Sequence, residues 1–462
     1  MKIKIDNYSF DKVTKKITFT DYTTIRLDGI LLITNTTSNI IIYNFADPTK
    51  GGTVATNVLT LTYDTSAMAN TDKLLIYYDD NTASANSGAV KIINSSGVAQ
   101  GVLMEDGAIT GRDYLVAIAE EEITSHKKFV KIGYTPTMTT TESDVWSKAG
   151  AYVFPATAIQ MQISSDVAAG ATADTATVIK GNAEGANQTI LCDVGGTATE
   201  LNDVSVDFTA ATAVAIGDVV LVDPKGASPE WGYVTAVAAT KLTLAGGLSS
   251  GGTFATARAY TVVDYSAFSG AHVVKIDYLT SAYAEKTILM CLNNTTAVTT
   301  KDTTGSNLTD LFRINSFGVI AVGSGNKATG NLWLESVIVT PRTGTIYSYI
   351  TALFTRARNG IYTVPAGKTL FINKFSAGYS LVAGTKWEYA RIYFRTNREP
   401  ATQFLTNNLF YVDFELLVNN QTVILPLALP KKILEKTDIR VSGIASATGV
   451  AVCSYRGWLE TN

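Results

Sequence analysis

The chain has 462 residues, of which 46% are hydrophobic and only 17% charged, whereas about 25% charged residues are usual in soluble domains. Its net charge of −3 excludes the basic surplus of a protein that binds nucleic acid, and the nearest approach to a basic cluster is the pair Lys431-Lys432. The length allows roughly two to four domains, and the low charge suits a surface that neighbouring subunits cover.

The start of the chain, Met1-Lys-Ile-Lys-Ile-Asp6, lacks the long apolar stretch of a signal peptide, and no segment approaches the roughly 20 apolar residues that span a bilayer. We therefore expect no membrane partner. The three cysteines, Cys192, Cys291 and Cys453, are odd in number, far apart and without metal-ligand spacing. This pattern predicts buried free thiols and assembly in a reducing cytoplasm.

Residues 1–112 consist of short apolar runs that polar turn clusters separate, a pattern typical of an antiparallel sandwich or small barrel. We predict a small N-terminal β module here, with an exposed loop at 81–97, where Ser, Ala, Asn and Gly dominate. Its strands are predicted at 16–20, 29–34, 39–44, 57–63 and 73–78.

Residues 113–125 are expected to connect this module to the rest of the chain. Their Ala and Glu content favours a helix, and Asp113 stands where it could cap the first turn. Another strand is the alternative, and the residues alone do not choose between them.

Residues 126–188 together with 264–462 are predicted to form one two-sheet sandwich of the jelly-roll type. Ten or more strands follow one another with no long helix between them, which excludes a parallel α/β sheet. The strands are predicted at 160–164, 271–278, 286–292, 311–322, 331–339, 347–354, 391–395, 410–417, 422–425, 437–442 and 450–458.

Residues 189–263 read as a small β-barrel inserted into a loop of that sandwich. Four short strands, each closed by Gly or polar turns, fit a barrel of five or six strands, which would remove exposed strand edges. Exposed loop tips are the places where such insertions are best tolerated. The strands are predicted at 215–222, 230–237, 241–244 and 259–263.

Residues 360–375 are predicted to form a hairpin within the sandwich. Tyr362 and Val364 share one face of the first strand, and Leu370 and Ile372 share one face of the second. Pro365 and Gly367 suit the second and last positions of a tight turn between them.

The search for catalytic residues yields none, and the chain is predicted not to be an enzyme. The only two histidines, His126 and His272, have no nucleophile elbow or obvious partner in the sequence. Gly367-Lys368-Thr369 lacks the earlier glycine and the following helix of a phosphate-binding loop. Gly323-Ser-Gly325 joins two predicted strands, so it is no dinucleotide-binding turn.

The acidic pairs Asp79-Asp80 and Glu105-Asp106 could serve a glycosidase or a calcium site, but adjacent acids on a loop are ordinarily just solvated. The 22 tyrosines could line a sugar-binding surface, although buried sandwich positions use more aromatic rings. We therefore predict no catalytic, cofactor-binding or metal-binding residues and no cofactor.

Several strand-and-turn motifs resemble, in the same order, a family of virion structural proteins of tailed bacteriophages. The resemblance covers roughly 123–462, and residues 17–80 resemble a module at the front of other phage virion proteins. Two features depart from the family pattern: Asn294 stands where the pattern Leu-Asn-Gly-Thr-Thr has glycine, and the predicted small barrel at 189–263 splits the matched region. The motifs are Ile123–Lys128, Val145-Trp146, Tyr152–Pro155, Gly270–Leu279, Leu292–Val298, Phe312–Asn315, Val322–Gly325, Tyr362–Thr369, Asp438–Val441 and Gly457-Trp458.

The resemblance implies a non-enzymatic component of a phage particle, with the N-terminal module docked on the particle and the sandwich projecting outward. We expect a homo-oligomer, in the first place a trimer, that is assembled in the host cytoplasm and serves as a capsid decoration or head fibre. A tail, collar or baseplate component is the alternative. A carbohydrate-binding adhesin for host-surface glycans, with its site in 189–263 or in the loop 81–97, is a further alternative from another class.

Overall fold

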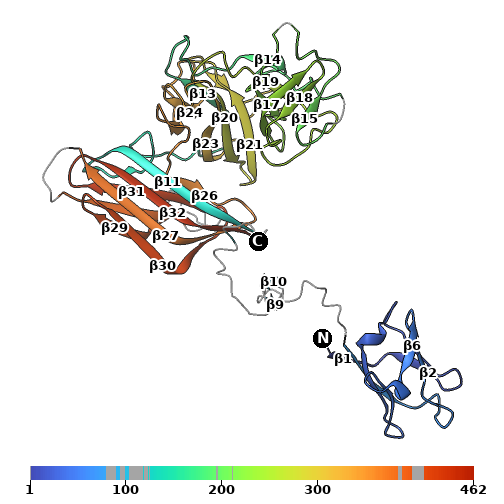
Figure 1. The fold of residues 1–462 in the computed structure, drawn as a ribbon. Helices are drawn as coiled ribbons and strands as arrows, with labels where there is room; N and C mark the ends of the chain where they lie inside the picture. The colour runs from blue at the N-terminus through green and yellow to red at the C-terminus, as the bar shows by residue number, and fades with distance from the viewer. Residues whose placement is uncertain are drawn as a thin grey trace. The chain divides into compact units, whose positions relative to one another are not determined.

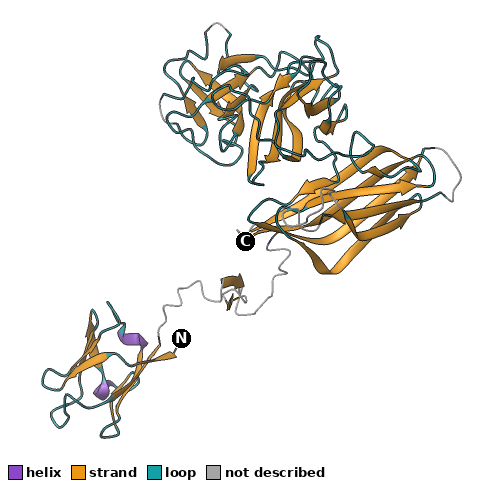
Figure 2. Ribbon diagram, turned by 180° about the vertical axis from the view of Figure 1, so that it is seen from behind, coloured by secondary structure: helices purple, strands orange, loops and turns teal. Residues whose placement is uncertain are grey.

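The computed structural model describes residues 2–79, 90–93, 99–102, 118, 123, 125–193, 196–210, 212–382, 388–397 and 410–462. The protein is nearly all β, built from antiparallel sheets, which confirms the predicted fold class (Figures 1 and 2). The chain divides into two compact units, Met1–Val116 and Ala117–Asn462. Among the described residues, no helix is long and apolar enough to cross a membrane.

The first unit packs two four-stranded sheets around one core. Alternation of apolar and polar residues lets each strand bury one face, and Ile17, Phe19, Ile33 and Ile76 are almost fully shielded from solvent. One sheet has the order β1 (Lys2–Ile5), β8 (Leu74–Asp79), β4 (Ile30–Asn35) and β5 (Ile40–Asn44). The other has the order β2 (Tyr8–Asp11), β3 (Lys16–Phe19), β7 (Val58–Leu61) and β6 (Gly52–Ala55). The 3-10 helices η1 (Leu27–Gly29) and η2 (Pro48–Lys50) lie in the connections between the two sheets.

Part of the predicted loop 81–97 is strand. β9 (Val90–Ile93) pairs with β10 (Ala99–Val102), so residues 90–93 of the predicted loop are strand. The remainder of 81–97 lies outside the described residues, as does nearly all of the connector predicted at 113–125.

The second unit ends in a two-sheet sandwich. Its core includes Phe375, Phe394, Val441 and Tyr455, each fully buried. One sheet has the order β11 (His126–Met138), β32 (Gly449–Thr461), β27 (Lys368–Leu381) and β30 (Thr422–Ile433). The facing sheet has the order β12 (Ser143–Asp144), β31 (Asp438–Ala445), β28 (Ala390–Thr396) and β29 (Tyr411–Val418), with β26 (Ile361–Thr363) also paired to β31.

A bulge in β27 sets which of its side chains enter this core. Leu370 and Ile372 face inward, the register then shifts between Ile372 and Lys374, and Phe375 continues the buried row. Without the extra residue, a strict two-residue alternation would point Phe375 out of the core.

The predicted hairpin at 360–375 is wrong. β26 and β27 belong to the two different sheets of the sandwich, and Pro365 to Gly367 carry the chain from one sheet to the other. The predicted turn positions are also wrong, because the central turn residues are Ala366 and Gly367, which places Pro365 first and Gly367 third. Gly367 has a φ of 72°, which glycine adopts freely, and Ala366 donates its N–H to the carbonyl of Tyr283 at 2.9 Å. The turn residues between β26 and β27 therefore did not show that these two strands pair with each other, and they pair with β31 and β32 instead.

A separate core fills the middle of the second unit. Residues that were predicted to form one sandwich with the C-terminal strands instead surround Ile163, Ile276, Phe317 and Leu334, which pack against one another. One sheet of this part has the order β22 (Val298–Thr299), β13 (Met161–Ser165), β24 (Leu332–Ser336) and β25 (Ile346–Ile350). The other has the order β21 (Glu285–Cys291), β20 (Ala271–Leu279) and β23 (Arg313–Val322).

The strands expected in the inserted barrel form a six-stranded sheet that starts earlier than 189. Its central strand β16 reads Val-Val-Leu-Val and is buried on both faces. Val220 and Val222 enter the sheet's own core, while Val219 and Leu221 pack with Val273 of β20. The sheet has the order β14 (Val178–Gly181), β19 (Tyr260–Val263), β16 (Val219–Val222), β17 (Glu230–Ala238), β18 (Lys241–Leu244) and β15 (Glu200–Asn202).

The backbone at position 294 suits asparagine or glycine. Asn294 has a φ of 51°, in the left-handed region that glycine adopts freely and asparagine tolerates. Its backbone N–H donates to Asp174 O at 2.9 Å, and its carbonyl accepts from Ser165 N at 2.8 Å, so the turn is held on both sides.

The Asn294→Val substitution should lower the free energy of unfolding by about 1–2 kcal/mol, because a β-branched side chain is strained in this conformation. Asn294→Gly should change it by less than about 1 kcal/mol. Urea unfolding followed by tryptophan fluorescence measures both, with Asn293→Val at the exposed neighbour as the control. Equal losses from the two valine variants would contradict the backbone argument.

Candidate functional site

His126 lies at the start of β11 and is buried. Ser125 Oγ lies 2.8 Å from its Nδ1, and Glu460 Oε2 lies 3.4 Å from its Nε2. Serine, histidine and glutamate thus stand in line, but Ser125 is the neighbouring residue in sequence and Glu460 is the cross-strand partner of His126 in the β11–β32 ladder. The arrangement fastens the beginning of β11 to the end of β32.

His272 lies in β20 and is fully buried. Its Nε2 is 3.1 Å from the carbonyl of Phe268, and burial lowers the pKa of the ring despite this contact. The imidazole is therefore neutral and serves as a core residue. His272 and His126 lie in different sheets, on β20 and β11.

The other predicted candidates do not come together. Gly367-Lys368-Thr369 leads into β27, a strand, as the sequence predicted. Gly323-Ser-Gly325 follows β23, and Asp79 ends β8, whereas Asp80, Glu105 and Asp106 lie outside the described residues. The cysteines are buried and free, as predicted. No group of three or more potential metal ligands occurs in the described part of the chain.

A buried ion pair joins the middle core to the C-terminal sandwich. Arg313 of β23 donates from Nε to Asp438 Oδ1 at 2.9 Å and from Nη2 to Asp438 Oδ2 at 3.1 Å. The two side chains are 6% and 0% exposed, so the bidentate contact lies out of water. Arg313 also donates to the carbonyl of Pro155 at 2.7 Å.

Neighbouring polar side chains donate further hydrogen bonds to the Asp438 carboxylate of this pair. The hydroxyl of Thr363 donates to Asp438 Oδ1 at 2.5 Å, and the amide of Asn397 donates to Asp438 Oδ2 at 3.2 Å. Asn315 exchanges two hydrogen bonds with the backbone of Thr363, at 2.8 and 2.9 Å. Both oxygens of the buried Asp438 carboxylate therefore accept hydrogen bonds, as a buried polar group requires.

Aromatic rings cover the guanidinium of Arg313. Its Cζ lies 3.8 Å from the ring centroid of Phe312 and 5.0 Å from that of Phe154. These rings exclude water from the pair and add cation–π attraction. Apart from Asn397, the residues of this junction come from four of the sequence motifs quoted above, 152–155, 312–315, 362–369 and 438–441, which are far apart in sequence and meet here.

A second buried carboxylate lies beside this junction. Asp144 of β12 is 2% exposed, accepts from the backbone N–H of Tyr152 and lies 3.5 Å from Arg440 Nε. Burial raises the pKa of Asp144 to about 6, although the charge of Arg440 opposes the shift.

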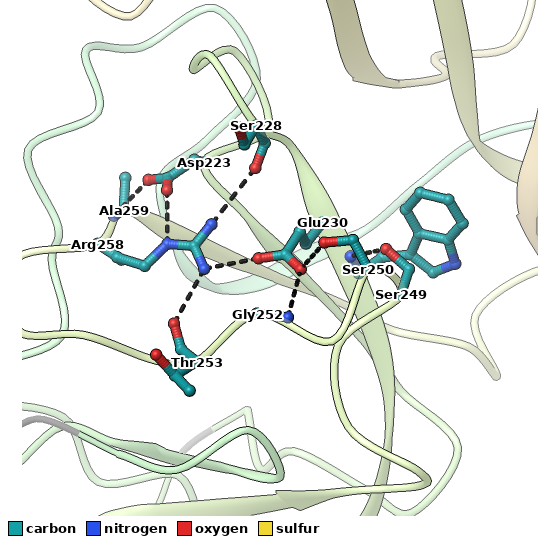
Figure 3. A network of polar contacts seen from close by, with 10 residues as sticks. Asp223, Ser228, Glu230, Ser249, Ser250, Gly252, Thr253, Arg258 and Ala259 are labelled. Atoms are coloured by element: carbon teal, nitrogen blue, oxygen red, sulfur yellow. Dashed lines mark hydrogen bonds and ion pairs between the residues drawn. The ribbon is translucent and has the colours of Figure 1, made fainter. Parts of the chain in front are cut away.

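A third polar network lies where the central strands β16 and β17 of the six-stranded sheet are connected (Figure 3). Arg258 donates from Nε to Asp223 Oδ2 and from Nη1 to Glu230 Oε2, both at 2.7 Å. Ser250 and Gly252 also donate to Glu230. Burial alone would raise the pKa of Glu230, but the hydrogen bonds from Ser250 and Arg258 hold it below its usual value. The network fixes the turn at 227–229 and the turn at 249–253.

A groove of about 490 Å3 lies next to this network. The strands β20, β21 and β23 contribute to it, the start of β11 and the two turns also line it, and five lysines but only two carboxylates are among its lining residues. The lysines are Lys127, Lys128, Lys275, Lys286 and Lys368, and the carboxylates are Asp277 and Glu285.

Sequence reasoning missed both the junction and the groove. Arg313 and Asp438 were quoted within motifs, yet nothing in their spacing shows that they pair. The groove's lysines are spread from 127 to 368, so no local basic cluster announces it.

Comparisons with known proteins do not assign a family. No protein-family model matches the chain, and no curated protein matches it. Among solved structures, one of infectious bursal disease virus, Gt strain, aligns with 73% of this chain and 75% of its own chain at 9% identity. Its TM-score of 0.09 is too low for it to inform fold or function.

The Arg313→Met substitution should destabilise the protein by about 3–5 kcal/mol, because it leaves the Asp438 carboxylate buried without its cation. Adding Asp438→Asn should recover part of the loss, since the amide removes the uncompensated charge. Chemical denaturation measures both. Arg391→Met, which breaks the exposed pair with Glu415, is the matched control and should have a much smaller effect. An Arg313→Met loss no larger than the control's would contradict a role for the junction.

The raised pKa of Asp144 predicts a pH dependence of stability. Between about pH 4 and pH 6 the folded protein keeps this proton while the unfolded chain releases it, so stability falls as pH rises through that window. Asp144→Asn removes the titration. The stability of this variant relative to wild type should therefore rise by about 2 to 3 kcal/mol from acid to neutral pH. Denaturation midpoints across the pH range measure it, and parallel curves would refute the assignment.

Proposed function

We propose that the protein is a non-enzymatic structural component of a tailed-bacteriophage particle, present as a homo-oligomer, in the first place a trimer. A capsid decoration or head fibre is the favoured position, and the tail, collar or baseplate is the alternative. The N-terminal unit would dock on the capsid or tail, and the second unit would project from it.

The observation that carries the proposal is the outer face of the sheet β11–β32–β27–β30. Ile132, Ser454, Ser376 and Ile424 lie opposite one another across its four strands, so they form one row on one face. Ile132 is 52% exposed and Ile424 is 53% exposed. The row carries no charge.

The row on one side of this one continues the uncharged surface, and the row on the other side brings in two charges. Val452 is 40% exposed and pairs with Gly378, a residue without a side chain, in the next row. Val130 is 46% exposed on the other side, in a row that also contains Arg456 and Lys374. Flat apolar faces with small side chains and few charges are typical of subunit contacts.

The position of the motif residues supports a structural role as well. Those of the junction bind other parts of the fold, as Arg313 does with Asp438, and are shielded from solvent. Motifs of this kind preserve an architecture and do not present reactive groups to a substrate.

Oligomeric state tests the proposal directly. Light scattering after size-exclusion chromatography should give three times the chain mass of 49.3 kDa. The double variant Ile132→Lys with Ile424→Lys should shift the protein to monomer, because charges in an apolar contact are costly to desolvate. Val339→Lys, at a 98% exposed position, is the control and should leave the mass unchanged.

A wild-type monomer at micromolar concentration would overturn the oligomer. Position in the particle is tested by deleting the gene and imaging the particles. Bare heads with intact tails support a head decoration, missing tail appendages support the alternative, and particles unchanged in composition and appearance would overturn the virion role.

A further inference from the structure

The six-stranded sheet meets the sheet β21–β20–β23 along an apolar seam. Val219 and Leu221 of β16 pack there with Val273 of β20 and Leu289 of β21. Cys291, the last residue of β21, belongs to the same cluster and is only 5% exposed. This cluster is separate from the core of the six-stranded sheet and from the middle core, so the seam can open locally while both of those cores stay packed.

His272 stands directly before Val273, at the start of β20, where the chain arrives from the six-stranded sheet. Its ring is fully buried, and Nε2 lies 3.1 Å from the carbonyl of Phe268 in the connection between β19 and β20. Since a carbonyl only accepts, we assign the ring hydrogen to Nε2. Nδ1 is buried and has no hydrogen-bond partner among the described residues. The neutral ring is thus held by one hydrogen bond and turns a bare nitrogen toward the interior.

Three carboxylates act on the charge of His272, each from a different segment. Asp264 follows β19, Asp218 precedes β16, and Asp174 precedes β14. Each of them already accepts backbone N–H groups, at 2.7–2.9 Å. The ends of β21 and β23 approach His272 with uncharged backbone groups. The carboxylates around the ring are therefore engaged with the backbone and are not ion-pair partners of the histidine.

A proton added to Nδ1 is costly in this place. It would create a charge in a fully buried site and an N–H donor without an acceptor. The carboxylates could accept it only by giving up hydrogen bonds to the backbone. Burial accordingly lowers the pKa of His272, although the Phe268 carbonyl and the three carboxylates oppose the shift. An opened seam returns the ring to water and to its usual pKa, so the open form binds the proton more readily and acid favours opening.

We propose that His272 is a pH-sensitive switch, whose protonation opens the seam between the six-stranded sheet and β20–β21 while the cores on either side stay folded. For one linked proton, the equilibrium constant for opening rises by up to about tenfold per pH unit below 6.5. Asp218 acts in the opposite direction, because burial raises its pKa and the closed seam keeps its proton. That contribution is common to all chains that keep Asp218, so it cancels when variants are compared. The switch lies within one chain and is independent of the proposed structural role.

The three buried cysteines report where the chain opens. Cys291 lies in the seam, Cys192 in the core of the six-stranded sheet and Cys453 in the core of the C-terminal sandwich. Pulse labelling of the full chain with 4,4′-dithiodipyridine, followed by peptide mass spectrometry, gives the labelling rate of each thiol. Each rate is divided by that of the same thiol in the urea-unfolded chain at the same pH, because thiol reactivity itself depends on pH. From pH 7.5 to pH 5.5 this ratio should rise about five- to tenfold for Cys291 and stay constant for the other two.

Variants test whether His272 is the titrating group. His272→Gln keeps a donor for the Phe268 carbonyl and has no group that titrates in this range, so it should remove the rise at Cys291. His126→Gln is the matched control, because it removes the other histidine of the chain, and should keep the rise. Leu221→Ala thins the seam and should increase Cys291 labelling about equally at both pH values, which checks that this thiol reports seam opening.

Three results would overturn the proposal. One is a Cys291 ratio that is the same at pH 7.5 and pH 5.5 in the wild-type chain. Another is a rise that persists in His272→Gln or disappears in His126→Gln. The last is a rise of Cys192 and Cys453 in step with Cys291, which would mean unfolding of the whole second unit. The first and last results need no variant, so they decide the matter even if His272→Gln does not fold.

Discussion

Much of the second unit depends on one buried charge. The carboxylate of Asp438 is fully shielded from solvent, and an unpaired charge in that position would cost several kcal/mol. Arg313 has to reach it from another core, and Thr363 and Asn397 have to stand beside it. These requirements fix the position of β23 against the sandwich far more narrowly than apolar contact alone would, because hydrogen bonds are directional.

The three polar networks divide the work of positioning. The Arg313 junction links the two cores, the Arg258 network secures turns of the six-stranded sheet, and Asp144 holds the chain between β12 and Tyr152. The groove lies where strands and turns held by the first two of these networks meet, since Asn315 belongs to one network and Ser250 to the other. The strands and turns that border the groove are thus held by hydrogen bonds on two sides.

Strand existence followed from sequence, whereas strand partnership did not. Alternating apolar residues and polar turns indicated the strands at 16–20, 73–78 and 230–237 because period-two burial is local. The pairing of β26 with β31 and of β27 with β32 depends on residues about 80 positions away, and no local signal encodes it. The same reasoning explains why one sandwich was predicted for residues 126–188 and 264–462, where the structure has two separate cores. A chain that forms one core and a chain that forms two cores show the same pattern of strands in the sequence. The sequence shows Arg313 and Asp438, but it does not show that their side chains pair.

The strand β16 has a consequence for how this fold can change over time. Its four residues are buried on both sides, and Val219 and Leu221 rest on Val273 and Leu289, which lie outside the sheet. The six-stranded sheet therefore cannot be exchanged as an independent unit. If recombination replaced this sheet with an unrelated sequence, the apolar side chains of Val273 on β20 and Leu289 on β21 would lose their packing partners. Such an exchange should therefore succeed only when β20 and β21 are exchanged together with the sheet.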